Sequence, residues 1–327
     1  MVIVLDCGTT NTKIYGVTEG VCVGEKYIKM GFRDVAVGIG REELKAEIRK
    51  AIGVLAEENV GKKVRRVIAY GMLTSESGFR ELPHTIAPAG LEDLRNCVET
   101  VYDPAIWECV PITYIRGIKN SVDSALPPTE AVSRFDFMRG EETQTMGAIR
   151  LGCCKPPFHM VVLSSHTKFV HIDADGRITG SCTTMSGQYY EAVREHSIIG
   201  KSLQRTEESN WSLDAIIDCA GRCCRDGFTR ATMIPRFMEV MGGFTGADRD
   251  NFFQTLIIWE DMALLDFMEE QGEDTKLPYV VIGQKERCEL FVRILQKKLG
   301  AEVKTIVLSD REAIRDLSVA GALAIAD

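Results

Sequence analysis

The apolar residues of the chain fall into short runs and helical repeats that are separated by polar turns. Val2 to Leu5 form a strongly apolar run that predicts a buried strand, and apolar residues return after Lys13, so this region is predicted to be a hairpin. Between residues 42 and 58 the apolar positions recur at helical spacing with charges between them, which predicts an amphipathic helix. Its apolar face consists of Leu44, Ile48, Ile52 and Leu55.

The rest of the chain continues this alternation of strands and helices. Strands are predicted at residues 64–69, 110–115, 160–163, 277–283 and 303–308. Helices are predicted at residues 92–100, 139–152, 189–197, 285–300 and 313–326, and residues 180–187 are predicted to form a polar loop. Strands that alternate with helices in this way indicate an α/β fold class.

Composition restricts the kind of protein more than its activity. A chain of 327 residues is long enough for two domains, and 45% apolar with 26% charged residues is typical of a globular protein. The net charge is −8 and the basic residues are dispersed, which excludes a nucleic-acid-binding stripe. No apolar run approaches the roughly 20 residues of a membrane helix, and the first run lacks the basic flank of a signal peptide. We therefore expect a cytoplasmic protein without a membrane partner.

The cysteines do not indicate a metal or disulfide framework. Their number, 11, is odd, and most lie alone inside apolar runs, where a thiol behaves as a small hydrophobe. The one cluster, Cys219, Cys223 and Cys224, has neither the C-x-x-C spacing nor the nearby histidines of a zinc site.

The turn of the first hairpin, DCGTTNTK, has the composition of a phosphate-binding loop. Successive backbone amides and the polar side chains of such a turn can point at one anion, and a glycine lets the phosphate approach. Asp6 would repel a phosphate, so its expected role is to hold the waters of a Mg²⁺ ion. Alternatively, this is a plain hairpin whose Lys13 is only a solvated strand residue. The candidate phosphate contacts are Gly8, Thr9, Thr10, Asn11 and Lys13.

A second candidate site lies at the start of the helix predicted within 139–152. Glu141 and Glu142 can be explained by the favourable position of acidic residues at a helix N-terminus. A carboxylate there can also accept the proton of a sugar hydroxyl as it attacks phosphorus. Arg139, just before them, can bind a substrate carboxylate through two parallel hydrogen bonds.

Two further segments offer binding groups. The loop at 71–90 is long, and long loops in compact domains tend to carry function; its Thr74, Ser75 and Glu76 suit a polyol. Gly283 follows a buried strand and leaves room for a base or ribose, or it serves only the tight strand-to-helix turn. The two commonest nucleotide-binding glycine motifs are absent from the sequence.

The first hairpin has a weak second copy in the chain. The segments VIVLDCGTTNTKIYGV and MVVLSSHTKFVHID both consist of an apolar strand, a small polar turn that ends in lysine, and another apolar strand. This similarity arises either by chance from two hairpins or from two domains of one architecture whose polar turns face each other.

Together these motifs resemble the 2-dehydro-3-deoxygalactonokinase family, sugar-acid kinases of the actin and hexokinase fold. The resemblance covers nearly the whole chain, and its most specific block is FMRGEETQTMGA at residues 137–148. It implies two actin-like (ribonuclease H-like) domains, at 1–150 and 151–327, with ATP in the cleft between them. The other segments that carry it are DCGTTN, GMLTSESGF, PHTIAPAG, HTKFV, TTMSG and EHSIIG.

The resemblance also implies an activity and a set of site residues. It implies an enzyme that uses ATP and Mg²⁺ to phosphorylate the terminal hydroxyl of 2-dehydro-3-deoxy-galactonate in a cytosolic catabolic route. Glu141 would be the base, with Glu142 as the second choice, and Gly283 with Gln284 would meet the adenosine. The second phosphate hairpin would consist of Ser165, His166, Thr167 and Lys168.

The sequence departs from the family at three positions. Ser164 stands where a glycine is usual, Gln188 stands where a glutamate is usual, and Arg116 replaces a common proline and adds a possible contact for an acidic substrate. Two alternatives remain: a kinase of the same fold for another sugar or acid, and a non-enzymatic ATP-binding switch. The oligomeric state is expected to be a monomer or homodimer.

Overall fold

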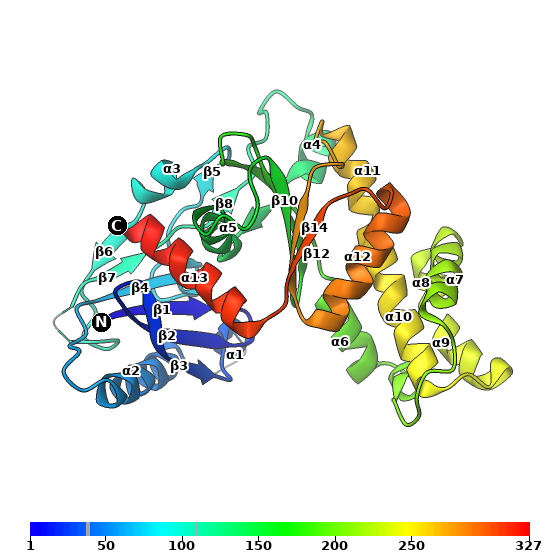
Figure 1. Ribbon diagram of the computed structural model, residues 1–327, viewed down its shortest axis with the longest axis horizontal. Helices are drawn as coiled ribbons and strands as arrows, with labels where there is room; N and C mark the ends of the chain where they lie inside the picture. The colour runs from blue at the N-terminus through cyan, green and yellow to red at the C-terminus, as the bar shows by residue number, and fades with distance from the viewer. Residues whose placement is uncertain (37–39, 109) are drawn as a thin grey trace. The chain divides into compact units, whose positions relative to one another are not determined.

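The computed structural model describes residues 1–36, 40–108 and 110–327, and it divides into two compact units (Figure 1). Unit 1 consists of Met1–Met160, Val170–Ser181 and Asp310–Asp327, and unit 2 consists of Val161–Phe169 and Cys182–Ser309. The expected domain ranges, 1–150 and 151–327, stay a prediction. Among the helices of the described residues, none combines the length and the apolar content that a membrane crossing requires.

Unit 1 is built on a six-stranded sheet with the order β3-β2-β1-β4-β7-β6. β1 pairs antiparallel with β2, which confirms the predicted first hairpin, and parallel with β4. The strands are β1 (Val2–Cys7), β2 (Thr12–Thr18), β3 (Val21–Ile28), β4 (Arg66–Gly71), β6 (Glu99–Val101) and β7 (Ile112–Tyr114). A three-stranded sheet follows the order β5-β8-β9, with β5 (Thr85–Ile86), β8 (Ile118–Lys119) and β9 (Phe137–Met138).

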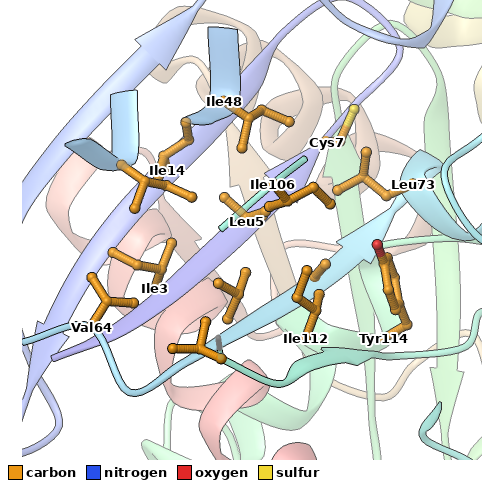
Figure 2. Close-up of a cluster of buried hydrophobic side chains, with 14 of the residues drawn as sticks. Ile3, Leu5, Cys7, Ile14, Ile48, Val64, Leu73, Ile106, Ile112 and Tyr114 are labelled. Atoms are coloured by element: carbon orange, nitrogen blue, oxygen red, sulfur yellow. The ribbon is translucent and has the colours of Figure 1, made fainter. Parts of the chain in front are cut away.

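The predicted amphipathic helix is present as α2 (Arg41–Glu58) and covers one face of this sheet. Figure 2 shows Ile48 of the helix in the same buried cluster as Ile14 and Leu5 of the strands. All four residues of the predicted apolar face are buried. Burying each such side chain contributes about 1.5–3 kcal/mol, so this contact holds α2 against the sheet.

The other helices of unit 1 include two that pack together closely. α13 (Arg311–Ala326), at the red end of the chain in Figure 1, lies along α5 (Glu141–Arg150). A Cβ on Gly147 would lie 2.0 Å from the Leu317 carbonyl oxygen, so the two backbones are in contact where only glycine fits. The remaining short helices are α1 (Phe32–Ala36), Met72–Thr74, α3 (Leu91–Arg95), α4 (Pro128–Ala131) and Val132–Arg134.

The second large sheet has the order β12-β11-β10-β13-β14, and β13 and β14 run parallel. The strands are β10 (Phe158–Leu163), β11 (Thr167–Ile172), β12 (Ile178–Thr184), β13 (Tyr279–Gly283) and β14 (Thr305–Leu308). The helices of unit 2 are α6 (Ser186–His196), Gly200–Leu203, α7 (Leu213–Arg225), α8 (Phe228–Ala231), α9 (Ile234–Phe237), Met238–Gly242, α10 (Gly246–Asp261), α11 (Ala263–Glu270) and α12 (Lys285–Leu299). Its core joins the sheet to α10 and α12, for example through Phe169 and Phe291.

One predicted element is wrong, and another is too long. Residues 180–187 are not a polar loop, because β12 continues to Thr184 and α6 begins at Ser186. The helix predicted at 92–100 ends at Arg95 and is followed by β6. In both cases pairing with a neighbouring strand outweighs the local sequence preference, since small polar residues fit a strand whose partners are already in place.

Candidate functional site

The turn of the first hairpin is tied to the helix that follows the third strand. Within the turn, the Gly8 amide donates to the Asn11 carbonyl at 2.9 Å. The carbonyls of Gly8 and Thr9 accept from the amides of Phe32 and Arg33, at 3.1 and 2.8 Å. The carbonyls therefore hold the turn in place, while the side chains of residues 9–11 remain half-buried at the surface of unit 1.

Gly31 lies directly against this turn. A Cβ at Gly31 would stand 2.5 Å from the Asn11 nitrogen and 2.5 Å from the Thr10 carbonyl carbon. Next along the strand, Thr12 is fully buried and its hydroxyl donates to the Met30 carbonyl at 2.9 Å. Residues 30–31, which the sequence pattern did not indicate, therefore pack against the turn and hold its backbone in place.

Asp6 and Lys13 are opposite each other on β1 and β2, as the predicted hairpin requires. The Lys13 Nζ lies 3.5 Å from Asp6 Oδ2, and the two side chains are 40% and 13% exposed. Asp6 is also opposite Tyr70 on β4. Burial raises the pKa of Tyr70, and the Asp6 charge raises it further. Asp6 is therefore a largely buried carboxylate, and its ion-pair partner Lys13 is held at a long distance.

The start of α5 lies beside the ends of β1 and β4. Gly71 has a φ of +77°, and a Cβ there would be 2.4 Å from the Cys7 carbonyl oxygen. Gly140 has a φ of +120°, and its Cβ position is 3.8 Å from the Gly71 Cα. These two glycines allow three backbone segments to meet at one edge of the sheet. The hairpin and the acidic helix start, predicted separately, share this edge within unit 1.

The structure separates the two candidate bases. Glu142 is fully buried, and its carboxylate accepts from the Gly140 amide at 2.9 and 2.8 Å and from the Thr143 hydroxyl at 3.2 Å. Burial raises the pKa of Glu142 to about 7, and the nearby Glu141 charge acts in the same direction. Glu141 is only half-buried. Glu142 is thus engaged with the backbone of its own helix start.

Arg139 connects this helix start to the loop after β4. Its Nη1 donates to the Thr74 hydroxyl at 2.8 Å and its Nη2 to the Leu82 carbonyl at 2.9 Å, with His84 Nδ1 at 3.4 Å from Nη2. Thr74 is fully buried and donates in turn to the Gly71 carbonyl at 3.0 Å. Burial lowers the pKa of Arg139. Both predicted substrate residues therefore also fix the loop.

The other predicted substrate residues differ in exposure. Ser75 is largely buried and donates to the Met72 carbonyl at 2.7 Å. Glu76 is exposed. Arg116, just after β7, is half-buried, and within the described part of the chain its Nε is enclosed without a hydrogen-bond partner.

In unit 2, the second hairpin turn is held by the start of α6. A Cβ on Gly187 would lie 2.2 Å from the Ser164 carbonyl oxygen, and the Gln188 amide donates to the Ser165 carbonyl at 2.8 Å. Ser165 and His166 are half-buried, with Ser165 Oγ and His166 Nδ1 3.3 Å apart. The TTMSG motif therefore supplies the helix start that supports this turn.

The other two residues of the predicted second phosphate hairpin are buried. Thr167 has no exposed surface and Lys168 is 5% exposed. The Lys168 Nζ donates to the Thr183 hydroxyl at 2.6 Å. The ammonium group is therefore held against β12, and its position is set by strand pairing rather than by the turn.

Gly283 is required by packing. A Cβ there would lie 2.8 Å from the Leu163 carbonyl oxygen, so β13 and β10 approach each other closely at this point. Gln284 is the residue that precedes α12, and its carbonyl accepts from the Cys288 amide at 2.9 Å. A role of these two residues toward adenosine stays a prediction.

Two charged residues beneath the second hairpin were missed by the sequence analysis. Arg287 donates through Nη1 to the Ser164 carbonyl at 2.6 Å and through Nη2 to the Thr167 hydroxyl at 3.2 Å. Asp261, at the end of α10, is fully buried. In the sequence, Asp261 follows Glu260, and Arg287 follows Lys285 and Glu286, so both look like ordinary surface charges of a helix and no signal marked them.

Comparisons with known proteins agree with this architecture. A family model described as 2-keto-3-deoxy-galactonokinase matches residues 6–319. A relative from Rhizobium meliloti (strain 1021), described as "Probable 2-dehydro-3-deoxygalactonokinase DgoK1", is 27% identical over 158 residues. That match spans 48% of this chain and 46% of the relative, so the chain covers about half the length of this curated protein.

A solved structure extends the similarity to the whole chain. It is described as "a putative 2-dehydro-3-deoxygalactonokinase protein from Sinorhizobium meliloti", and the match covers 100% of this chain and 98% of that chain at 19% identity. The TM-score of 0.74 confirms the expected α/β fold. Because the family model spans nearly all of the sequence, the chain belongs to the 2-keto-3-deoxy-galactonokinase family.

Proposed function

We propose that the chain is an ATP- and Mg²⁺-dependent kinase that transfers the γ-phosphoryl group to the terminal hydroxyl of 2-dehydro-3-deoxy-galactonate. Family membership supports the reaction class. The observation that carries the proposal is the close approach of Gly140 to Gly71 and of Gly71 to the Cys7 carbonyl, which brings the acidic helix start beside the end of β1. Such a kinase acts on a small molecule and works in a cytoplasmic catabolic route.

Phosphoryl transfer is catalysed mainly by positioning and by charge stabilisation. The turn at residues 8–11 receives the nucleotide phosphates, with its backbone clamped by Gly31 so that little rearrangement is needed on binding. Lys13 adds a positive charge on the adjacent strand. In unit 2, the turn at Ser165 and His166 offers a second set of polar groups, and Gly283 with Gln284 receives the adenosine.

The residues present fit a magnesium ion. Mg²⁺ is usually held by one or two carboxylates together with water and phosphate oxygens. Asp6 supplies one carboxylate, and its 3.5 Å separation from Lys13 Nζ leaves it without a short ion pair to break. When bound, the metal neutralises charge on the phosphates. Asp6 orients the waters around it.

Glu141 accepts the proton of the attacking hydroxyl. Its half-buried side chain at the first position of α5 is more accessible than that of Glu142, whose carboxylate is bonded to the Gly140 amide. Glu142 therefore positions the helix start. Arg116, with its enclosed Nε, and Arg139 bind the substrate carboxylate, while Arg139 also holds the loop that carries Thr74, Ser75 and Glu76.

The experiment is a phosphorylation assay over a panel of keto-deoxy sugar acids, with products identified by mass spectrometry. Replacing Glu141→Gln should lower kcat by about 100-fold or more, because general-base assistance is removed, and should leave ATP binding nearly unchanged. Glu43→Gln is the matched control, since Glu43 is an exposed acid in the first turn of α2. Full turnover by the Glu141 variant would remove it as the base.

The panel also separates the alternatives. If the protein phosphorylates a different sugar acid but not 2-dehydro-3-deoxy-galactonate, it is a kinase with another substrate. ATP binding without turnover on any acceptor would instead indicate an ATP-dependent switch.

A further inference from the structure

A buried carboxylate lies beneath the second hairpin in a place that is electrostatically unfavourable. Asp261 is the last residue of α10, where a negative charge faces the negative end of the helix dipole. Its side chain is fully buried, and burial of a carboxylate is costly unless hydrogen bonds compensate. Burial raises the pKa of Asp261. Burial also raises the pKa of neighbouring Glu260, and the Asp261 charge adds to that shift.

The hydrogen bonds to one oxygen of this carboxylate come from the end of β12 and from the start of α6, the helix start that supports the second hairpin. Asp261 Oδ1 accepts from the Thr184 hydroxyl at 2.5 Å and from the Ser186 hydroxyl. Thr184 ends β12 and Ser186 begins α6, and their hydroxyl oxygens are 2.7 Å apart. One carboxylate oxygen therefore joins a strand end to a helix start.

The network continues to the hairpin itself. The Thr167 hydroxyl and the Arg287 charge both act on Asp261 to lower its pKa. Arg287 donates to the Thr167 hydroxyl and to the Ser164 carbonyl. Thr167 is fully buried and follows Ser165 and His166, so its side chain faces the interior of unit 2 while they remain half-buried. Asp261 and Arg287 thus support the turn from the interior of unit 2.

We propose that Asp261 is a positioning residue: through Thr184 and Ser186 it fixes the helix start that packs against the second hairpin, and so sets that hairpin in the geometry that receives a phosphate of the nucleotide. This inference rests on the proposed kinase function. It deepens that function by giving a role to a residue that does not touch the ligand.

The test is a set of variants in which the KM for ATP and the KM for the sugar acid are measured separately. Asp261→Ala removes the acceptor and releases the hydroxyls, so the KM for ATP should rise about tenfold, as expected for loss of hydrogen bonds to a charged group, while the acceptor KM stays unchanged. Asp261→Asn keeps one acceptor oxygen and should restore the KM for ATP to within about threefold of the parent.

Asp248→Ala is the matched control. Asp248 lies in the first turn of the same helix, is 2% exposed, and accepts from the Thr245 amide and the Ser209 hydroxyl. It should lower the melting temperature without changing the ratio of the two KM values. If Asp261→Ala behaves in the same way as Asp248→Ala, the positioning role is wrong.

A second pair of variants, which disturb the core less, tests the proposal if Asp261→Ala does not fold. Thr184→Val keeps the side-chain shape and removes the hydroxyl, and Thr184→Ser keeps the hydroxyl. Only the valine variant should raise the KM for ATP, and equal values for the two would overturn the proposal. Failure of the kinase proposal is distinguishable, because the parent protein itself would then phosphorylate no acceptor, whether or not ATP protects it from heat.

Discussion

Both oxygens of the Glu142 carboxylate share the single backbone N–H of Gly140 in a bifurcated hydrogen bond, at 2.9 and 2.8 Å. The helix that begins at Glu141 is therefore capped by its own second residue. Because the Cβ position of Gly140 is 3.8 Å from the Gly71 Cα, this cap fixes the helix start beside the strand ends. The position of Glu141 thus depends on a neighbour that is itself fully buried.

The first prediction concerns the pH dependence of stability at Glu142. Its pKa is about 7 in the folded protein against an ordinary 4.5, so between these values the folded state keeps a proton that the unfolded state releases. The stabilisation from that proton is complete below pH 4.5 and is lost as the pH rises to 7. In the parent this loss of unfolding free energy amounts to up to about 3 kcal/mol, and Glu142→Gln should not show it.

Denaturant unfolding of the parent and of Glu142→Gln between about pH 4.5 and 8 measures the difference. The gap between the two curves should change across this range and be flat above it. A constant gap would mean that Glu142 does not titrate in this window.

The second prediction has the opposite sign. His159 and His171 are both buried, and their Nδ1 atoms are 3.1 Å apart. Burial lowers the pKa of His171 to about 3 from an ordinary 6.5, and His159 adds to this. Between pH 3 and 6.5 the unfolded state protonates His171 and the folded state does not. The stability from this residue is therefore full above pH 6.5 and falls as the pH falls toward 3.

At about pH 5 the loss from His171 is about 2 kcal/mol. His171→Gln keeps a hydrogen-bonding side chain but does not titrate, so its melting temperature should fall less than that of the parent between pH 7 and 5. If the parent and the variant lose the same stability in acid, that loss comes from groups other than His171.

The third prediction tests the contact between α5 and α13. Gly147→Ala would place a methyl group 2.0 Å from the Leu317 carbonyl oxygen, and the helices must separate to accept it. We expect a loss of about 2–4 kcal/mol in unfolding free energy, since backbone is harder to displace than a side chain. Gly53→Ala is the control, because Gly53 is inside α2 with nothing within 4 Å of its Cβ position.

Gly53→Ala should leave stability unchanged or raise it by about 0.5–1 kcal/mol, from helix propensity alone. Denaturant unfolding compares the two variants. Equal effects at both sites would show that the helices are not in such close contact.

The sequence predicted the elements with strong periodicity and the motifs made of neighbouring residues. The apolar face of α2, the first hairpin and the helix at Glu141 all depend on local patterns, and all are present. β12 was missed because its polar residues are accommodated by strand pairing that no local pattern shows. Asp261 and Arg287 were missed for a similar reason: their partners lie up to 123 residues away in the chain.

Candidate site residues were easier to find than to interpret. Thr74 and Lys168 have side chains that suit a ligand, yet in the structure they donate to Gly71 and Thr183. A sequence shows which groups are available. Only the fold shows which of them are already occupied.

The last prediction concerns Gly31, which clamps the first turn. Gly31→Ala would place its Cβ 2.5 Å from the Asn11 nitrogen and the Thr10 carbonyl carbon, so the turn must move. If this turn holds the nucleotide phosphates, the KM for ATP should rise about tenfold or more, because a displaced backbone amide loses its charge-assisted hydrogen bond. Gly40→Ala, with nothing within 4 Å of its Cβ position, should leave the KM for ATP unchanged. Steady-state kinetics with ATP varied would check both, and an unchanged KM in a folded Gly31→Ala protein would place the phosphates elsewhere.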